Sequence, residues 1–401
     1  MDIAPEPGAP AAPPPPDPAG APDLVTVVLR QLLSDAHHYS PGVEHRRPST
    51  ATPAAGARTL VRDRIRDVVE RVAGRAGFSR RHFDPEIAAA EVTRLIAQSA
   101  GLQTSYGLLA DEPSRQALVD LVKLRALGPY HSPLRVTPAE YRARQQHADR
   151  TLRRSPATFH TPDPFFSSLS LYELPVPGGA PIRLHSHSVD VVSVYLLDQY
   201  SYVRGAQVAA RDGDVVLDVG GCFGDTALYF ASRIGPSGRV YTFEFDPVNL
   251  EVLRANLGLN PELAARIEIV PFALWDVPGE TLRFTSAGRT TSLALAGASP
   301  ASASVLTTTV DEFVAQRGLG RVDFIKLDVE GAEGNVLRGA GDSLARFRPA
   351  LALAAYHRDH DLIELPQLID SLNLGYRFWL DSFSSVQEET VLFAASRNSS
   401  T

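Results

Sequence analysis

The chain has 401 residues, a length that predicts two or three domains and a substantial core. Its formal net charge of −7 lacks the cationic excess that nucleic-acid binding needs. Cys222 is the only cysteine, which excludes an intrachain disulfide and a cysteine metal cluster. With no apolar run near the ~18 residues of a membrane span and no pattern of a secretory signal, we expect a cytoplasmic protein that binds neither nucleic acid nor membrane.

The first part of the chain divides into a tail and a helical region. Residues 1–22 contain nine prolines and six alanines, a composition that predicts a disordered tail. Residues 23–160 have a mainly helical pattern, and Thr137 to Glu140 read as a capping box with proline at the first helical position. This region carries no catalytic signature. It suits a substrate lid, a dimerisation element of a homodimer, or both.

The second domain is expected to span residues 161–401. From residue 206 onward strands and helices alternate, which predicts an α/β fold with a doubly wound, Rossmann-like parallel sheet. Two apolar runs, YRFWLDS and ETVLFAA, predict a closing antiparallel hairpin of the kind found in class I methyltransferases. We expect core strands near 214–219, 239–244, 266–271, 322–328 and 350–356, and helices near 225–234, 247–258, 333–345 and 362–372.

The central motif of the chain is the stretch DVVLDVGGCFGDT, residues 214–226. An apolar run suited to a parallel strand buried on both faces ends at Asp218. A glycine-rich turn and a helix-like run follow, an order that lets a cofactor approach the backbone closely. About twenty residues later a second apolar run carries Glu244, whose carboxylate can accept hydrogen bonds from both hydroxyls of a ribose. The motif predicts a site for an adenosine-containing cofactor.

Two positions favour S-adenosylmethionine over a dinucleotide. The fingerprint GxGxxG, aligned on Gly220, would need glycines where the chain has Cys222 and Asp225. Asp225 also stands in the first turn of the helix, where a carboxylate competes with a phosphate but suits a cofactor with an ammonium at its near end. An NAD-dependent oxidoreductase is therefore the less favoured alternative.

Six blocks in order along the chain resemble the FkbM family of S-adenosylmethionine-dependent methyltransferases. The resemblance covers roughly residues 190–395 and leaves out the first 150. It implies O-methylation of a hydroxyl on a small molecule, such as a bacterial secondary metabolite or its sugar. The blocks are DVGGCFGDTALYFA, VYTFEFDPVNLEVLRANLGLN, ALWDVPGE, FIKLDVEGAE, YHRDHDLIELPQLI and ETVLFA.

The expected cofactor residues lie at the ends of the first three strands and in the turn after the first. We expect Asp218 either to bind the ammonium of S-adenosylmethionine or to order the turn. The glycines are expected to leave room for the methionine portion of the cofactor, and Ala273 and Leu274 to border its adenine. The full set is Asp218, Gly220, Gly221, Cys222, Gly224, Asp225, Thr226, Glu244, Phe245, Ala273 and Leu274.

Methyl transfer to a hydroxyl needs a base or a metal, because a neutral alcohol is a poor nucleophile. Asp328 and His357 end the fourth and fifth strands, at the sheet edge where ligands bind, and they are the candidate catalytic residues. A histidine with an ordinary pKa near ~6.5 takes the proton directly. The alternative is a divalent cation such as Mg²⁺, which lowers the pKa of the hydroxyl. Its candidate ligands are Asp328, Glu330, His357 and Asp359.

Two further charged residues have structural expectations. Glu333 is expected to cap the helix that follows the fourth strand, and Lys326 is expected to pair with an acid. The predicted function is methyl transfer to a hydroxylated small molecule. A degenerate module that binds the cofactor or dimerises without catalysis is the alternative from another functional class.

Overall fold

The computed structural model describes residues 23–28, 31, 85–128, 132, 134–160, 168–176, 179–204, 206–285, 292–294 and 303–396. The proline-rich segment 1–22 lies outside the described residues. No described helix is both long enough and apolar enough to cross a membrane.

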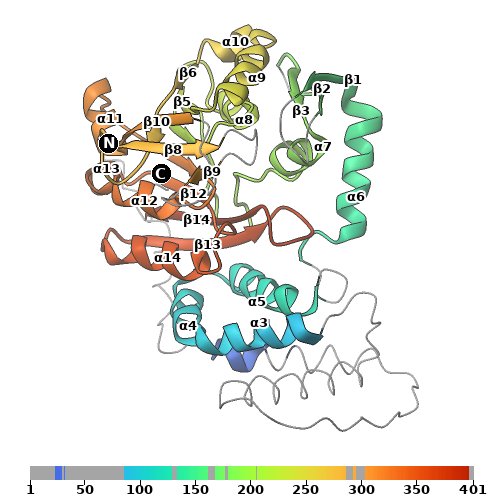
Figure 1. Ribbon diagram of the computed structural model, residues 1–401, viewed down its shortest axis with the longest axis vertical. Helices are drawn as coiled ribbons and strands as arrows, with labels where there is room; N and C mark the ends of the chain where they lie inside the picture. Colours follow the sequence, from blue (N-terminus) through green and yellow to red (C-terminus); the bar gives the residue numbers. More distant parts are fainter. Residues whose placement is uncertain are drawn as a thin grey trace, which may run out of the picture.

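A seven-stranded sheet forms the centre of the molecule (Figure 1). Its strand order is β6-β5-β4-β11-β12-β14-β13, and β14 runs antiparallel to both of its neighbours. Five parallel strands closed by an antiparallel hairpin confirm the predicted class I methyltransferase fold. The strands are β4 (Val215–Val219), β5 (Arg239–Phe243), β6 (Ile267–Val270), β11 (Phe324–Leu327), β12 (Ala350–Ala354), β13 (Tyr376–Ser382) and β14 (Thr390–Ser396).

Alternate residues of each strand enter two separate cores, one on each face of the sheet. Leu217 packs with residues of α11, α12, α13 and α14, whereas its neighbour Val216 packs with residues of α8. Both faces are therefore covered, which explains why the strands are apolar without alternation. The helices are α8 (Asp225–Arg233), α9 (Pro247–Gly258), α10 (Pro261–Ala264), α11 (Val310–Arg317), α12 (Glu333–Arg338), α13 (Gly341–Phe347) and α14 (Asp361–Ser371).

Two smaller sheets flank the central one. The first has the order β1-β2-β3 and joins residues on both sides of the expected domain boundary between residues 160 and 161. The second has the order β7-β10-β8-β9 and forms in a segment for which the sequence predicted no strands. The strands are β1 (Arg153–His160), β2 (Ser168–Leu174), β3 (Ile182–Ser186), β7 (Ala273–Leu274), β8 (Thr281–Thr285), β9 (Ser292–Ala294) and β10 (Ala303–Thr308).

A long helix and two short π-helical turns connect the N-terminal part to the sheet domain. Helix α6 (Pro138–His147) begins with the predicted capping box, in which Thr137 and Glu140 each bind the other's backbone N–H. It continues into η1 (Ala148–Leu152). After β3, α7 (Ser188–Asp190) and η2 (Val191–Leu196) lead toward β4.

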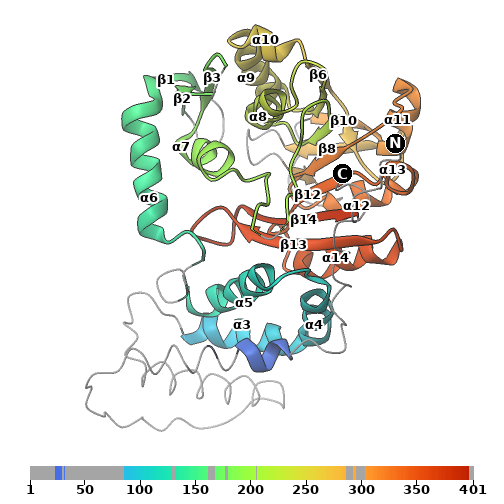
Figure 2. The same ribbon diagram turned by 180° about the vertical axis from the view of Figure 1, so that it is seen from behind.

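Three N-terminal helices pack along the outer edge of the central sheet, below β13 and α14 in Figures 1 and 2. They are α3 (Pro85–Ala97), α4 (Ser99–Leu108) and α5 (Glu112–Leu127). Leu109 forms an isolated parallel bridge with Phe378, and the N–H of Ala110 donates to the carbonyl of Phe378 at 2.8 Å. The helices thus cover an edge strand whose backbone groups would otherwise face solvent.

Candidate functional site

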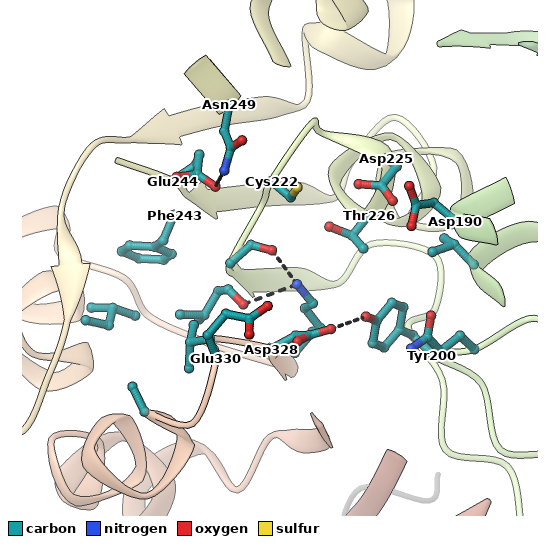
Figure 3. Close-up of a pocket in the computed structure, with 18 of the residues that line it drawn as sticks. Asp190, Tyr200, Cys222, Asp225, Thr226, Phe243, Glu244, Asn249, Asp328 and Glu330 are labelled. Atoms are coloured by element: carbon teal, nitrogen blue, oxygen red, sulfur yellow. Dashed lines mark hydrogen bonds between the residues drawn. The ribbon is translucent and has the colours of Figure 1, made fainter. Parts of the chain in front are cut away.

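A cleft lies where the parallel strands β4, β5, β6 and β11 end, as expected for a sheet of this kind (Figure 3). It holds about 1070 Å³ of empty space, the part open to solvent included. Of the expected cofactor residues, eight line it: Gly220, Cys222, Asp225, Thr226, Glu244, Phe245, Ala273 and Leu274. Asp328, one of the two expected catalytic residues, lines the same cleft together with Glu330, whereas His357 is not among its lining residues.

Asp218 orders the glycine-rich turn from beneath. Its side chain is fully buried and accepts hydrogen bonds from the hydroxyls of Thr226, at 2.9 and 3.0 Å, and Thr242, at 2.9 Å. The ammonium of Lys326 lies 3.4 Å from Asp218, which confirms the predicted pairing of Lys326 with an acid. Burial alone would lower the pKa of Lys326, but Asp218 and other nearby carboxylates raise it above its ordinary value. Of the two roles expected for Asp218, the structure shows the ordering of the turn.

The glycines of the turn are required by packing against neighbouring strands. Gly220 has φ +85°, and a Cβ there would lie 1.9 Å from the carbonyl oxygen of Asp328. A Cβ on Gly221 would lie 2.1 Å from the hydroxyl of Thr242. Close packing is thus a sufficient reason for glycine at these two positions, and the expected room for the methionine portion of a cofactor stays a prediction. Gly220 lines the cleft, whereas Gly221 and Gly224 are not among its lining residues.

Glu244 is held rigidly at the end of β5. Its Oε1 accepts from the backbone N–H groups of Phe245 and Asp246, at 2.7 and 2.8 Å, and its Oε2 accepts from the amide of Asn249 at 3.1 Å. Burial raises the pKa of Glu244 to about 7, although these hydrogen bonds oppose the shift. The carboxylate therefore faces the cleft in a fixed position and titrates near neutral pH.

The far end of the cleft is apolar and aromatic. Ala273 and Leu274 of β7 line it, and the ring of Phe245 packs edge-on against Phe284 at 5.0 Å. Phe272 also lines this end and is 40% exposed, which leaves its ring accessible to a flat ligand. Phe272 was not among the expected site residues, although an aromatic residue directly after a core strand was a usable signal.

Two tyrosines hold the carboxylate of Asp328, and Figure 3 shows the contact of Tyr200. The hydroxyl of Tyr200 donates to Oδ2 at 3.1 Å, and the hydroxyl of Tyr356 donates to Oδ1 at 3.4 Å. Tyr356 lies two residues after the end of β12, beside His357, and could have been found there. Tyr200 precedes the sheet in the chain, and no motif marked it.

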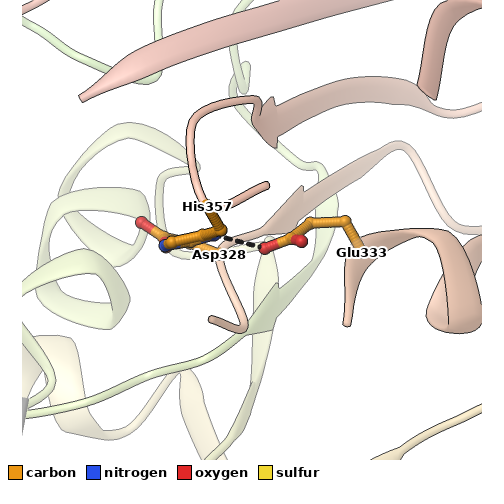
Figure 4. Close-up of side chains that lie close together, drawn as sticks. All are labelled: Asp328, Glu333 and His357. Carbon is orange, nitrogen blue, oxygen red and sulfur yellow. Dashed lines mark hydrogen bonds and ion pairs between the residues drawn. The ribbon is translucent and has the colours of Figure 1, made fainter. Parts of the chain in front are cut away.

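His357 lies between two carboxylates (Figure 4). Its Nδ1 is 2.8 Å from Oε1 of Glu333, and its Nε2 is 3.5 Å from Oδ1 of Asp328. Burial alone would lower the pKa of His357, but the hydrogen bond to Glu333 and the nearby carboxylates raise it to about 9. The pKa of His357 is therefore higher than the ordinary value expected from the sequence, and the imidazole is protonated at neutral pH.

The candidate metal ligands do not all come together. Ligand atoms of Asp328, Glu333 and His357 lie within 4.8 Å of one another, and Glu330 Oε2 is 3.8 Å from Nε2 of His357. Glu333 also accepts from two backbone N–H groups of the turn before α12, as expected of a capping residue. Asp359 instead forms an ion pair with Arg94 at 2.8 Å and is largely exposed.

One wall of the cleft contains none of the residues expected from the sequence. This wall comes from the segment between β3 and β4 and from the turn before β14, far from the glycine motif in the chain. The missed lining residues are Asp190, Ser193, Val194, Gln199, Tyr200 and Glu389.

Residues 218–378 match the family description "Methyltransferase FkbM domain". No curated protein matches the chain. Among solved structures, a methyltransferase FkbM from Methylobacillus flagellatus KT is similar to this chain, with 18% sequence identity. The match covers 85% of this chain and 71% of that chain and has a TM-score of 0.49. Fibrillarin from Aeropyrum pernix, in complex with natively bound S-adenosyl-L-methionine, shows 14% identity over 57% of this chain and 90% of that chain, with a TM-score of 0.34.

The O-methyltransferase from Bacillus cereus, in complex with SAH, shows 13% identity over 52% of this chain and 80% of that chain, with a TM-score of 0.31. The fold assignment depends on the strand order described above, and the family assignment on the sequence match. The match to the FkbM methyltransferase domain covers residues 218–378, less than half of the chain.

Proposed function

We propose that this chain transfers the methyl group of S-adenosylmethionine to a hydroxyl of a small molecule, a bacterial secondary metabolite or its sugar. One observation carries the proposal: the carboxylate of Asp328 lines the same cleft as the expected cofactor residues and is held on both of its oxygens. A carboxylate so fixed is suited to take a proton from an acceptor hydroxyl.

The residues of the cleft fit S-adenosylmethionine. The fixed carboxylate of Glu244 suits a ribose diol, and the apolar end with Phe272 suits an adenine. Asp225 in the first turn of α8 disfavours a pyrophosphate and suits an ammonium. When bound, the cofactor supplies an electrophilic methyl group.

The chain's own residues then handle the proton. The methyl group would leave the sulfonium sulfur, with S-adenosylhomocysteine as the leaving group, and the acceptor oxygen would lose its proton as it is methylated. A carboxylate oxygen of Asp328 would accept that proton. His357 is protonated at neutral pH and lies 3.5 Å from Asp328, so its charge favours the ionised carboxylate that this step requires. Glu333 holds the imidazole in place through Nδ1.

A divalent cation is the second candidate for activating the hydroxyl. Nε2 of His357 is buried and makes no hydrogen bond within the described residues, while Asp328 and Glu330 lie close to it. A carboxylate bound to the other nitrogen of the ring, as Glu333 is here, is the usual support of a metal-binding histidine. The cation would be held by His357, Asp328 and Glu330, and it would lower the pKa of the hydroxyl.

A labelled-methyl transfer screen tests the proposal. The full chain is incubated with methyl-labelled S-adenosylmethionine and a panel of sugar and polyketide alcohols, and calorimetry measures the affinity for S-adenosylmethionine and S-adenosylhomocysteine. We expect binding of both cofactor forms and transfer to at least one alcohol, with transfer reduced at least a hundredfold in Asp328→Asn. Binding without transfer to any alcohol would favour the degenerate module. Thermal stabilisation by NAD but not by S-adenosylmethionine would favour the oxidoreductase.

A further inference from the structure

Asp328 is fixed by hydroxyl groups from two different parts of the chain. Tyr356 belongs to the neighbouring strand end of the same sheet and donates to Oδ1. Tyr200 lies 128 residues before Asp328, in the loop after η2, and donates to Oδ2. Tyr200 also lies outside the matched segment 218–378, so part of the support of this carboxylate comes from beyond the methyltransferase domain.

Packing holds Tyr200 in place. The residue is 3% exposed, and its ring contacts the rings of Tyr229 and Phe230 on α8, with centroids 6.3 and 5.8 Å away. The ammonium of Lys326 lies 5.7 Å from the centroid of the same ring. A ring so enclosed cannot turn away, and its hydroxyl points at Asp328 (Figure 3).

The segment that leads to Tyr200 is attached to the sheet domain by two hydrogen bonds. The amide of Gln199 donates to Oε2 of Glu389 at 2.6 Å. Earlier in the segment, the hydroxyl of Ser193 donates to the carbonyl of Phe383 at 3.4 Å. Both partners lie at the β13–β14 hairpin, so the loop is connected to the sheet independently of its contact with Asp328.

An aspartate needs such support if the direction of its carboxylate matters. The torsion that rotates the carboxylate plane is broad and roughly twofold, so the side chain alone does not fix which way each oxygen faces. Donors on both oxygens fix that plane. We infer that Tyr200 is a positioning residue, whose hydroxyl, together with that of Tyr356, fixes the plane of the Asp328 carboxylate toward the acceptor. This inference rests on the proposed role of Asp328.

The test is a double-mutant cycle on the full chain. Tyr200→Phe removes only the hydroxyl, and we expect about a tenfold lower kcat for the best alcohol of the screen, with the KM for S-adenosylmethionine within about twofold. In an Asp328→Asn background the same change should have no further effect, because Tyr200 acts through Asp328. The matched control is Tyr376→Phe, which removes a buried tyrosine hydroxyl bonded to the carbonyl of Pro349. It should leave kcat unchanged in both backgrounds.

A spectroscopic measurement keeps the test independent of turnover. In the full chain labelled with [ζ-¹³C]tyrosine, the Tyr200 resonance is identified by its loss in Tyr200→Phe. Asp328→Asn should move this resonance and leave that of Tyr376 in place. A Tyr200 resonance that Asp328→Asn does not move, or a kcat that Tyr200→Phe does not lower, would overturn the inference. If Asp328→Asn retains full transfer, the proposed role of Asp328 fails instead, even where the resonance moves.

Discussion

The ammonium of Lys326 lies 3.4 Å from the carboxylate of Asp218, and the two residues are direct partners in the pairing of β11 with β4. Both side chains are buried, and Lys326 also donates to the carbonyls of Val219 and Gly220. This ion pair therefore joins two neighbouring strands at the start of the glycine-rich turn. It connects the part of the cleft that is expected to bind cofactor with the strand that carries Asp328.

Replacing Lys326 with Met should destabilise the protein strongly. The change leaves the buried charge of Asp218 without its ion-pair partner, and removal of one partner of a buried pair typically costs about 3–5 kcal/mol. Urea unfolding measures the free energy of unfolding. The matched control is Arg321→Met, because Arg321 pairs with Asp323 through two hydrogen bonds but its side chain is 58% exposed. The control should cost less than about 1 kcal/mol. Equal losses in the two variants would contradict the prediction.

Glu244→Gln should weaken the binding of S-adenosylmethionine about 10- to 100-fold. A carboxylate that accepts hydrogen bonds from a ribose contributes about 1.5–3 kcal/mol per bond, and the amide accepts with one oxygen only. Because the pKa of Glu244 is about 7, binding to the unaltered chain should strengthen as the pH rises through 7, and Glu244→Gln should lose this dependence. Calorimetry at several pH values measures both effects. Glu251→Gln, on the exposed side of α9, is the control and should bind like the unaltered chain.

His357 should make stability depend on pH above neutrality. Its pKa is raised from 6.5 to about 9, so the folded state holds a proton that the unfolded state has released. The stabilisation is complete below pH 6.5 and is lost as the pH rises through 9, by at most ~3 kcal/mol. Unfolding experiments between pH 6.5 and 9 should show this fall, and His357→Gln should flatten it. Glu244→Gln is the control, because the raised pKa of Glu244 changes the free energy of unfolding between pH 4.5 and about pH 7. This variant should keep the fall in stability above that range. An unchanged slope in His357→Gln would refute the assignment.

Metal removal separates the two ways of activating the hydroxyl. If Asp328 is the base, exhaustive EDTA treatment leaves transfer unchanged. If a cation is required, transfer falls and returns with Mg²⁺ or Mn²⁺, and metal affinity rises with pH because the bound imidazole must be neutral. Glu330→Gln should then weaken metal binding at least tenfold, whereas Asp359→Asn should not, since Asp359 pairs with Arg94.

The central sheet could be predicted because its strands are buried on both faces and therefore appear as continuous apolar runs. The expected helix 333–345 is in fact two helices, α12 and α13. Gly339, at the end of α12, lies where a Cβ would be 2.1 Å from the carbonyl oxygen of Trp275, a close approach that the helical pattern does not reveal. Strand β8 pairs with both β9 and β10 in a segment of weak apolar pattern. Strand pairing there depends on tertiary contacts.

Within the site, the predicted residues were those next to the glycine motif and at the strand ends. Their positions follow from the fold, because the carboxyl ends of parallel strands meet at one edge. The raised pKa of His357 could not be predicted, because it depends on the exact placement of Glu333. The contact of Tyr200 with Asp328 joins segments 128 residues apart and leaves no local pattern in the sequence.

The bridge between Leu109 and Phe378 has a consequence for shortened versions of the protein. A chain cut back to residue 138 would lack α3, α4 and α5, and the whole outer side of β13 would present unpaired N–H and C=O groups. Such an edge offers a template for a second chain to add a strand, so the isolated methyltransferase domain should self-associate as its concentration rises. The N-terminal helices thus cover an edge strand to which a second chain could otherwise add a strand.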